Sequence, residues 1–475
     1  MNFEPVIGFE VHVEPTTQSK MFCRCSAQYF GAPPNTITCP ICLGLPGALP
    51  VPNRVGIEAC VKLGIALGCQ INERSLFERK HYFYPDLPKG FQISQYKSPF
   101  CTNGVLKLNK KSIRVNRVHM EEDTAKLLHQ GTETLIDFNR SGVPLIEVVS
   151  DPDLRSPDET KEALVKLQQI IRYLNVSFAD MEKGTMRCEV NISVRKAGTN
   201  VLPPYRVEIK NLNSFRAVED SIRYEINRQS KALSAGESLN QETRGWDEHK
   251  KVTVIQRSKE EAHDYRYFPE PDIPPVLLSK DEIKSIRKSI PELPDDARAR
   301  FIEQYKLTDA DANLLTETKD MADFFDEAAT LAPDQIRAVS VWMSGEVRRR
   351  LNEKNLTLVS TKLAPAALVE LVTFVNDKTI TPATAKELLP EMMESGIMPQ
   401  KLVEQHGVSV VRDTGQLDEV VRKVVEQNAK AVADYKAGKT QALSFLLGQI
   451  QRELKGQGDT GRIKKILLQI LTHLA

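Results

Sequence analysis

The chain has 475 residues, of which 41% are hydrophobic and 27% are charged. This is ordinary globular composition, and the length predicts two or three domains. The formal net charge of +1 excludes a polycation that binds nucleic acid through its overall charge, so such a partner would need a local basic patch. Neither a signal-peptide pattern nor a membrane-length apolar run is present, and we therefore expect a cytoplasmic protein without a membrane segment.

The first predicted strand carries two polar side chains on one face. Glu10 and His12 alternate with apolar residues along positions 6–13. Successive side chains of a strand point to opposite faces, so these two share a face while the apolar ones share the other. A carboxylate and an imidazole placed in this way indicate a site for hard-cation chemistry.

Four cysteines follow within twenty residues, in a C-x-C pair and a C-x-x-C pair: Cys23, Cys25, Cys39 and Cys42. Without a secretion signal, disulfides are not expected. Four thiolates can close a tetrahedral zinc site and leave no position for water, so the metal would be structural. The alternative is four unrelated cysteines in an apolar loop.

Further acids lie on or beside predicted strands. The triplet at 121–123 could contribute one or two carboxylates to a Mg²⁺ site with Glu10 and His12, although most acidic triplets are exposed turns. Alternation separates Glu121 from Glu122, and the residues alone do not decide which points inward. Glu147 and Glu189 are flanked by apolar residues, where a bare buried carboxylate would be costly without a partner or metal.

The first ~290 residues are predicted to mix short strands with two helices, at 53–67 and about 158–174. The strands at 113–116, 145–149, 186–195 and 205–210 alternate polar and apolar residues. This pattern fits an antiparallel sheet that packs one face against the core and exposes the other face to solvent. The solvent-exposed face carries a mixture of acidic, amide and basic side chains. This mixture fits either an active-site cleft or an ordinary solvated surface.

A proline-rich segment at 268–295 indicates a domain boundary, and helical periodicity dominates the sequence after it. Predicted helices span 311–329, 365–376, 381–395, 418–437 and 441–454. From residue 430 onward, eight Lys or Arg residues stand against three acids, which suits either phosphate binding or a solvated surface. The predicted fold class is α+β, with a sheet domain and zinc knuckle at 1–292, a helical domain at 293–407 and a helical tail at 408–475.

No complete P-loop and no G-x-S-x-G elbow is present. If ATP is used, a metal and cationic side chains on the sheet must hold its phosphates. The candidate cations are Lys80, Arg117, Arg140, Arg187 and Lys210. Each of them could equally be ordinary surface charge.

Several long and unusual motifs resemble the B subunit of the tRNA-dependent amidotransferase, the Asp/Glu-tRNA amidotransferase. They occupy residues 7–13, 82–86, 119–123, 139–147, 210–215, 241–244 and 264–272, and the segment around 442–449 is similar to the YqeY-like tail of that family. The resemblance runs in order along essentially the whole chain.

The resemblance implies an ATP-dependent ligase. Its substrate would be Glu-tRNA(Gln) or Asp-tRNA(Asn), whose side-chain carboxylate is phosphorylated and then amidated by ammonia. The ammonia would come from a separate glutaminase A subunit, joined through a small C subunit. ATP and Mg²⁺ are the implied cofactors, with structural Zn²⁺ as in the members that carry these cysteines.

The resemblance also implies roles for single residues. It makes Glu10, His12 and Glu122 the Mg²⁺ ligands, and Glu147, Glu189 and Asn191 further site residues. It assigns phosphate binding to Arg187 and Lys210 and tRNA binding to the basic tail. Two rival functions are a zinc-stapled tRNA-binding module without catalysis and a metal-dependent hydrolase that acts without tRNA.

Overall fold

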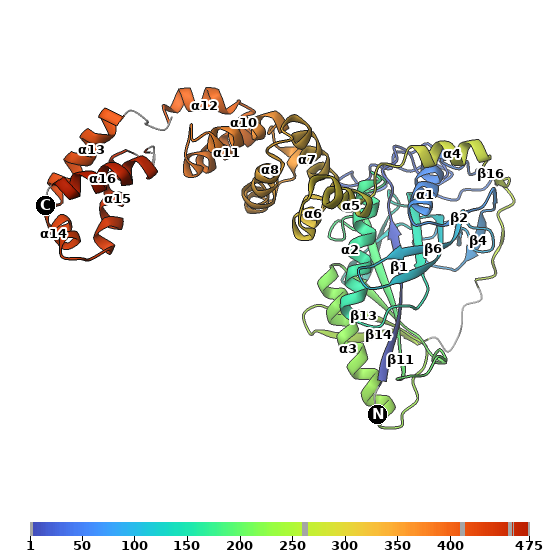
Figure 1. The fold of residues 1–475 in the computed structure, drawn as a ribbon. Helices are drawn as coiled ribbons and strands as arrows, with labels where there is room; N and C mark the ends of the chain where they lie inside the picture. The colour runs from blue at the N-terminus through green and yellow to red at the C-terminus, as the bar shows by residue number, and fades with distance from the viewer. Residues whose placement is uncertain (1–2, 259–264, 409–413, 455–457, 459, 474–475) are drawn as a thin grey trace. The chain divides into compact units, whose positions relative to one another are not determined.

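The computed structural model describes residues 3–258, 265–408, 414–454, 458 and 460–473. Asp264 of the last family motif, and Lys455 and Asp459 of the tail, lie outside this range. The chain divides into two compact units, Met1–Leu293 and Pro294–Ala475, which are described separately (Figure 1). Across the described ranges, no helix is long and apolar enough to span a membrane.

A nine-stranded sheet is the frame of the first unit, in the order β14-β13-β12-β11-β1-β10-β7-β6-β2. Its strands are β1 (Phe3–Val13), β2 (Gln70–Ile71), β6 (Cys101–Lys107), β7 (Ser112–Glu122), β10 (Pro144–Ser150), β11 (Met186–Lys196), β12 (Val207–Leu212), β13 (Glu242–Asp247) and β14 (Val252–Ser258). Neighbours are antiparallel, except that β12 and β13 run parallel. The predicted antiparallel sheet is thus confirmed with one exception.

Three smaller sheets accompany it. The three-stranded one joins β15 (Phe268–Pro269), β4 (Glu78–His81) and β5 (Phe91–Ser94). The two-stranded ones pair β16 (Val276–Leu277) with β3 (Arg74–Ser75), and β8 (Lys126–Gln130) with β9 (Glu133–Asp137).

The register of the central strand brings distant parts of the sequence together. On β1, His12 stands opposite Glu147 of β10 on one side and opposite Arg187 of β11 on the other. Glu147 in turn faces His119 of β7. Directly opposed side chains on neighbouring strands lie close enough to interact, so the pairing itself assembles a cluster of polar groups.

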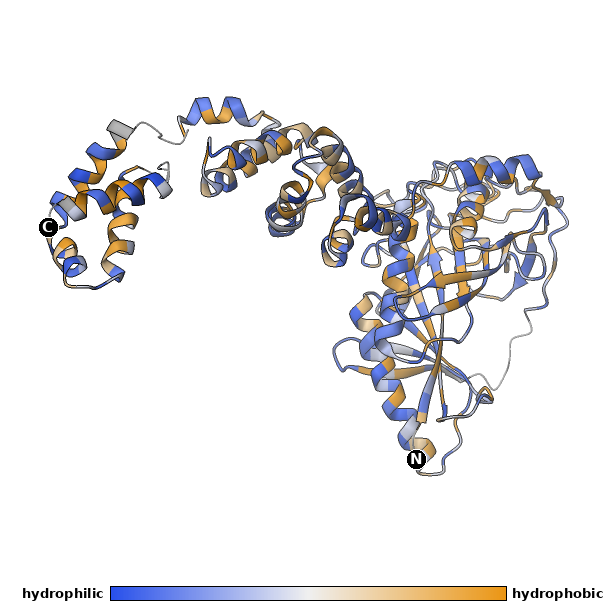
Figure 2. Ribbon diagram, viewed as in Figure 1, coloured by the Kyte–Doolittle hydropathy of each residue, from blue (hydrophilic) through white to orange (hydrophobic). Residues whose placement is uncertain are grey.

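The two faces of the sheet differ as predicted. The apolar residues of β1, such as Phe9 and Val11, are at most 1% exposed. They belong to a core shared with α1 (Arg54–Ala66), α2 (Pro157–Tyr173) and α3 (Phe215–Ser234). Figure 2 shows the alternation as orange and blue bands along the strands of this unit. The helices therefore cover the apolar face, and the polar face stays available for chemistry.

Two of the four helices in this unit were not predicted. The helices expected at 53–67 and 158–174 are confirmed as α1 and α2, and Ser156 caps α2 by accepting a bond from the Glu159 amide. The expectation of only two was wrong, because α3 and α4 (Lys280–Lys288) are also present. The start of α3 does have a sequence signal, since Ser214 is its N-cap and accepts a bond from the Ala217 amide.

The second unit is helical, as predicted. Its α-helices are α5 (Pro294–Tyr305), α6 (Asp309–Leu315), α7 (Lys319–Leu331), α8 (Ile336–Trp342), α9 (Arg348–Lys354), α10 (Pro365–Asn376), α11 (Pro382–Ser395), α12 (Pro399–His406), α13 (Thr414–Gln427), α14 (Ala429–Lys436), α15 (Gln441–Glu453) and α16 (Thr460–His473). A π-helical turn (Met343–Val347) and a 3₁₀ turn (Leu358–Ser360) complete it.

Two predicted helices of this unit are each divided in the structure. The region 311–329 contains α6 and α7, and 418–437 contains α13 and α14. The last helices share an apolar core that includes Leu417, Leu446 and Leu467. The predicted boundary at 407/408 borders residues 409–413, which lie outside the described residues, so the division into helical domain and tail stays a prediction.

Candidate active site on the polar face of the sheet

Four neighbouring strands place charged and amide side chains on the face opposite the helices, and β12 continues this row. Alternation along each strand and the register between strands put them there. They are Glu10 and His12 on β1, His119 and Glu121 on β7, Glu147 on β10, Arg187, Glu189 and Asn191 on β11, and Glu208 and Lys210 on β12.

One cluster on this face combines His12, Glu121 and Glu147. The Nε2 of His12 lies 3.3 Å from Glu121 Oε1 and 3.6 Å from Glu147 Oε2. One ligand atom from each residue lies within 4.8 Å of the others. His119 Nε2 is 3.2 Å from Glu147 Oε2, while its buried Nδ1 has no hydrogen-bond partner among the described residues. One imidazole and two carboxylates at this spacing fit a divalent cation that prefers oxygen ligands.

Charge and burial oppose each other in this cluster. Burial alone would lower the pKa of His12, but Glu121 and Glu147 outweigh it and raise that pKa well above its usual value. Burial would raise the pKa of Glu147, but His119 and His12 hold it well below its usual range. The carboxylates are therefore ionised and need a cation, which is a proton on His12 or a bound metal.

A second acidic cluster lies beside the first. Glu10, Glu189 and Glu208 place one oxygen each within 4.8 Å of one another. The Asn191 amide donates to Glu10 Oε1 at 2.8 Å, and Lys210 Nζ lies 2.9 Å from both oxygens of Glu189. Burial, together with the charges of Glu147 and Glu189, raises the pKa of Glu10. The predicted trio of metal ligands is thus not one cluster, since Glu10 and His12 belong to different groups.

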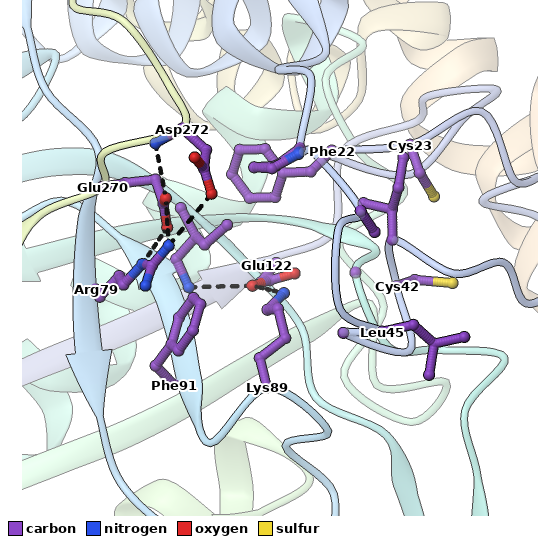
Figure 3. A pocket seen from close by; sticks show the side chains of 16 residues that line it. Phe22, Cys23, Cys42, Leu45, Arg79, Lys89, Phe91, Glu122, Glu270 and Asp272 are labelled. Carbon is purple, nitrogen blue, oxygen red and sulfur yellow. Dashed lines mark hydrogen bonds and ion pairs between the residues drawn. The ribbon is translucent and has the colours of Figure 1, made fainter.

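Glu122 does not join Glu10 and His12, which corrects the predicted arrangement. Glu122 alternates with Glu121 at the end of β7 and therefore leaves the polar face. Its carboxylate pairs with Lys89 and accepts a bond of 3.0 Å from the Ile93 amide. Figure 3 shows this pair in a pocket of about 130 Å³. The same pocket is lined by Cys23, Cys42 and the ion pair of Arg79 with Glu270.

The five predicted phosphate-binding cations fall into two groups. Lys210 pairs with Glu189 and Glu208, and Arg187 and Arg140 lie 2.6 Å and 3.6 Å from Asp123 Oδ2. Lys80 and Arg117, in contrast, form no ion pair within the described part of the chain. Arg117 also has a buried Nε without a hydrogen-bond partner there. These two cations are the ones left available for an anionic ligand.

Aromatic rings from the small β15-β4-β5 sheet and its loops surround the two unpaired cations. Lys80 Nζ lies 5.2 Å from the centre of the Tyr265 ring, and Arg117 Cζ lies 5.8 Å from that of Tyr96. Tyr96 stacks on Tyr267 with the ring centres 4.8 Å apart. Ring faces attract cations and nucleobases alike, so this wall of the site suits an aromatic or cationic group.

The four knuckle cysteines converge as predicted. Their sulfur atoms lie within 4.8 Å of one another, and all four are free thiols. A bond from Cys23, with the Cys39 amide and the charge of Lys20, lowers the pKa of Cys42 to about 4 despite burial. The Cys42 thiol and burial raise the pKa of Cys23, and burial also raises that of Cys25. The fit to a structural zinc centre therefore depends on the four converging sulfurs.

Two residues of the site, His119 and Glu208, were not proposed from the sequence although each has a signal there, and Glu121 was left open against Glu122. His119 and Glu121 alternate with the apolar residues Val118 and Met120. This alternation extends the predicted solvent-exposed face to the end of β7. Glu208 lies between Val207 and Ile209 in a strand whose alternation was recognised. Their meeting with β1 depends on strand order, which alternation alone does not give.

Comparison with known proteins adds an independent result. Residues 5–284 match the family model described as GatB/GatE catalytic domain, and residues 323–471 match the one described as GatB domain. The chain is 47% identical to a protein of Thermotoga neapolitana over 99% of both chains. It is 48% identical to one of Thermomicrobium roseum over 99% of both, and 47% identical to one of Caldanaerobacter subterraneus over 99% of this chain and all of that one. Each of the three is named as the B subunit of an aspartyl/glutamyl-tRNA(Asn/Gln) amidotransferase.

Proposed function

This chain belongs to the GatB family of amidotransferase B subunits, and on that premise we propose that the polar face of its sheet is where the carboxylate of a mischarged tRNA is activated. The chain is a subunit of a glutamine-hydrolysing, ATP-dependent ligase that acts on aspartyl- or glutamyl-tRNA. The rival functions, a tRNA-binding module without catalysis and a hydrolase without tRNA, are not favoured.

The reaction has two balanced steps. A side-chain carboxylate oxygen attacks the γ-phosphorus of ATP, which forms an acyl phosphate and releases ADP. Ammonia then attacks the acyl carbon, the C–O bond to phosphate breaks, and an amide and inorganic phosphate result. The first step depends on positioned cations more than on a nucleophilic side chain, in keeping with the absence of P-loop and G-x-S-x-G motifs from the sequence.

The single observation that carries the proposal is the convergence of His12, Glu121 and Glu147. We assign these three as the Mg²⁺ ligands, with Glu121 in place of the predicted Glu122. Mg²⁺ at this place would neutralise charge on the transferred phosphoryl group. The side chain of His119 holds Glu147 in place through its Nε2.

The neighbouring groups extend the site on both sides. Glu10, Glu189 and Glu208, oriented by Asn191 and Lys210, form a second oxygen-rich group that can serve a further cation. Lys80 and Arg117 are our candidates for holding the phosphates of ATP, because no carboxylate among the described residues lies within ion-pair distance of either. Against the effect of burial, the charges of Glu121 and Glu147 nevertheless raise the pKa of Lys80. Arg187 and Arg140 are fixed by Asp123, so they offer directed N–H groups more than free charge.

The assembly follows from the family. We propose a glutaminase A subunit as the source of ammonia, a small C subunit that joins it, and tRNA(Gln) or tRNA(Asn) held by the basic tail. The place of action would be the cytoplasm, where aminoacyl-tRNA is used. Zinc at Cys23, Cys25, Cys39 and Cys42 would act as a staple of the fold and take no part in the reaction.

The test is a reconstitution of this chain with its A and C partners. Glutamine, ATP, Mg²⁺ and either Glu-tRNA(Gln) or Asp-tRNA(Asn) are supplied, and amidated tRNA and ADP are measured for the wild type and for His12→Ala. We expect product from the wild type and its loss in the variant while tRNA still binds. Normal tRNA binding without product in the wild type would overturn the catalytic assignment in favour of a recognition module.

A further inference from the structure

The hairpin that carries the cysteine knuckle returns to the polar face of the sheet. After β1 the chain passes outward through 17–20 and comes back through 25–28. Backbone bonds from Lys20 N to Cys25 O and from Ala27 N to Gln18 O join the two arms. The second arm of the hairpin therefore places Tyr29 near the end of β1. Tyr29 belongs to the loop between the two cysteine pairs.

Tyr29 meets Glu14 there. Its hydroxyl lies 3.0 Å from Glu14 Oε1 and 3.2 Å from Oε2, and it donates its single proton to this carboxylate. Glu14 is 8% exposed. Among the described residues, Tyr29 is the only hydrogen-bond donor to its side chain. A buried carboxylate with a single donor is held in place by that donor.

Glu14 is a neighbour of Arg187 on the same face of the sheet. His12 stands opposite Arg187, and the Glu14 amide bonds to Thr185 O at 3.0 Å. Glu14 and Arg187 are therefore diagonal neighbours on adjacent strands, a spacing that long side chains bridge. Arg187 also binds Asp123 at 2.6 Å and keeps a buried Nε without a partner among the described residues.

Together, the Tyr29–Glu14 bond and the charge interaction of Glu14 with Arg187 connect the knuckle to the proposed reaction site. The connection runs from Tyr29 through Glu14 to Arg187, which lies beside His12 and is paired with Asp123 just after the end of β7. Arg187 is thus paired with one carboxylate, Asp123, and attracted by the charge of a second, Glu14, which is positioned from the knuckle loop. Loss of the Tyr29 hydroxyl frees Glu14 to turn and weakens the attraction that helps to orient Arg187.

We propose that Tyr29 is a positioning residue that couples the cysteine knuckle to Arg187 of the active site. The proposal rests on the function proposed above. It gives the knuckle a second role besides stapling the fold, since the loop it closes orients a guanidinium at the place of phosphoryl transfer.

The test uses a double-mutant cycle in the assembled complex, with ammonium chloride as the source of ammonia. The variants are Tyr29→Phe, Arg187→Lys and the pair, and kcat and KM for ATP are measured for amidated tRNA. The matched control is Tyr224→Phe on α3, which also removes one hydroxyl but lies on the opposite side of the sheet. Zinc per chain and Tm are recorded for every variant.

We expect Tyr29→Phe to lower kcat on the order of tenfold, the size of a hydrogen bond to a charged group. In the Arg187→Lys background the same change should cost less than about twofold, because residues that act through one another are not additive. Zinc content and Tm should stay at wild-type values, and Tyr224→Phe should match the wild type.

Two results would overturn the coupling. One is the same loss from Tyr29→Phe in both backgrounds. The other is a loss that follows zinc content or Tm, which would make the role of Tyr29 structural. A wild-type complex that forms no product would instead refute the proposed function, so the two failures are distinguishable.

Discussion

A buried carboxylate on α3 shows at the residue scale how charge is accommodated inside the first unit. Glu225 is fully buried and accepts bonds from Arg228, Gln229 and Thr253, with Arg244 at 3.3 Å. Burial would raise its pKa, but Arg228 and the other donors lower it below its usual value. The bonds therefore stabilise the ionised form and tie α3 to β13 and β14.

We expect Glu225→Gln to destabilise the first unit by about 3 kcal/mol at pH 7, because it leaves buried guanidinium groups without their anion. Since the folded-state pKa is depressed, this contribution is fully present above the unfolded-state pKa of about 4.5 and is lost as pH falls through the folded-state value. Urea unfolding at pH 7 and at pH 4 checks both statements. Exposed Glu237→Gln is the control and should change stability by less than about 0.5 kcal/mol.

Lys20 gives a second prediction at this scale. It is fully buried, its Nζ lies 3.6 Å from Cys42 Sγ and 2.9 Å from Ile37 O, and no carboxylate pairs with it among the described residues. Four thiolates around Zn²⁺ leave a net negative charge, which Lys20 would offset. We expect Lys20→Met to weaken zinc binding by roughly 10- to 100-fold in a chelator competition. Arg24→Met, an exposed change in the same turn, should not. Equal zinc affinity in both variants would contradict this role.

Residue identities on the polar face were predictable wherever alternation was unambiguous. Glu10 and His12 were placed correctly, because apolar neighbours on both sides fix their face. Glu122 was not, because the residues alone left the choice between Glu121 and Glu122 open. The resemblance favoured Glu122, whereas the register of β7 with β10 puts Glu121 on the polar face.

At the scale of elements, α3 explains the one departure from an antiparallel sheet. Parallel strands need a long crossover between them, and α3 supplies it between β12 and β13. Because α3 was not predicted from the sequence, the parallel pairing of β12 with β13 could not be predicted either. The strand at 186–195 and the helix at 365–376 were predicted well, because their periodicity is uninterrupted. The breaks at 316–318 and near 428 depend on packing between helices and are weakly marked in the sequence.

Removal of zinc should loosen the cysteine knuckle and leave the structure of the nine-stranded sheet unchanged. We expect a chelator to increase hydrogen exchange in residues 17–45, because the loop between the cysteine pairs loses its closure. The amides of β7 and β11, which are paired on both sides, should keep their protection. Exchange measured with and without chelator, followed by added zinc, gives the comparison. Unchanged protection in 17–45 would refute a structural metal there.

At the scale of the whole molecule, the nearly neutral charge requires that tRNA be held by a local surface. The last helices carry the basic excess that the sequence revealed, with Lys464 and Lys465 on α16. Composition indicated this basic surface, whose binding of tRNA stays a prediction, and it also predicted the change from mixed to helical structure. It could not predict how distant segments meet in one sheet, since that depends on strand order.

We expect Lys464→Glu with Lys465→Glu to weaken tRNA binding and to lower its salt dependence by about 0.9 for each phosphate that the tail no longer neutralises. The kcat at saturating tRNA should be unchanged, because the proposed reaction site lies on the sheet. Binding measured at several salt concentrations tests this, with the exposed Lys284→Glu on α4 as a control of the same charge type. An equal effect of the control would show that the weaker binding reflects net charge and not this surface.

The central claim is that Glu121, together with His12 and Glu147, serves phosphoryl transfer, while Glu122 belongs to a different environment. The most direct measurement is Mg²⁺-dependent ADP formation by the assembled complex with mischarged tRNA, compared between Glu121→Gln and Glu122→Gln. We predict a loss of at least about 100-fold for Glu121→Gln, and Mg²⁺-dependent ADP formation within about tenfold of wild type for Glu122→Gln. The reverse order of the two variants would contradict the account.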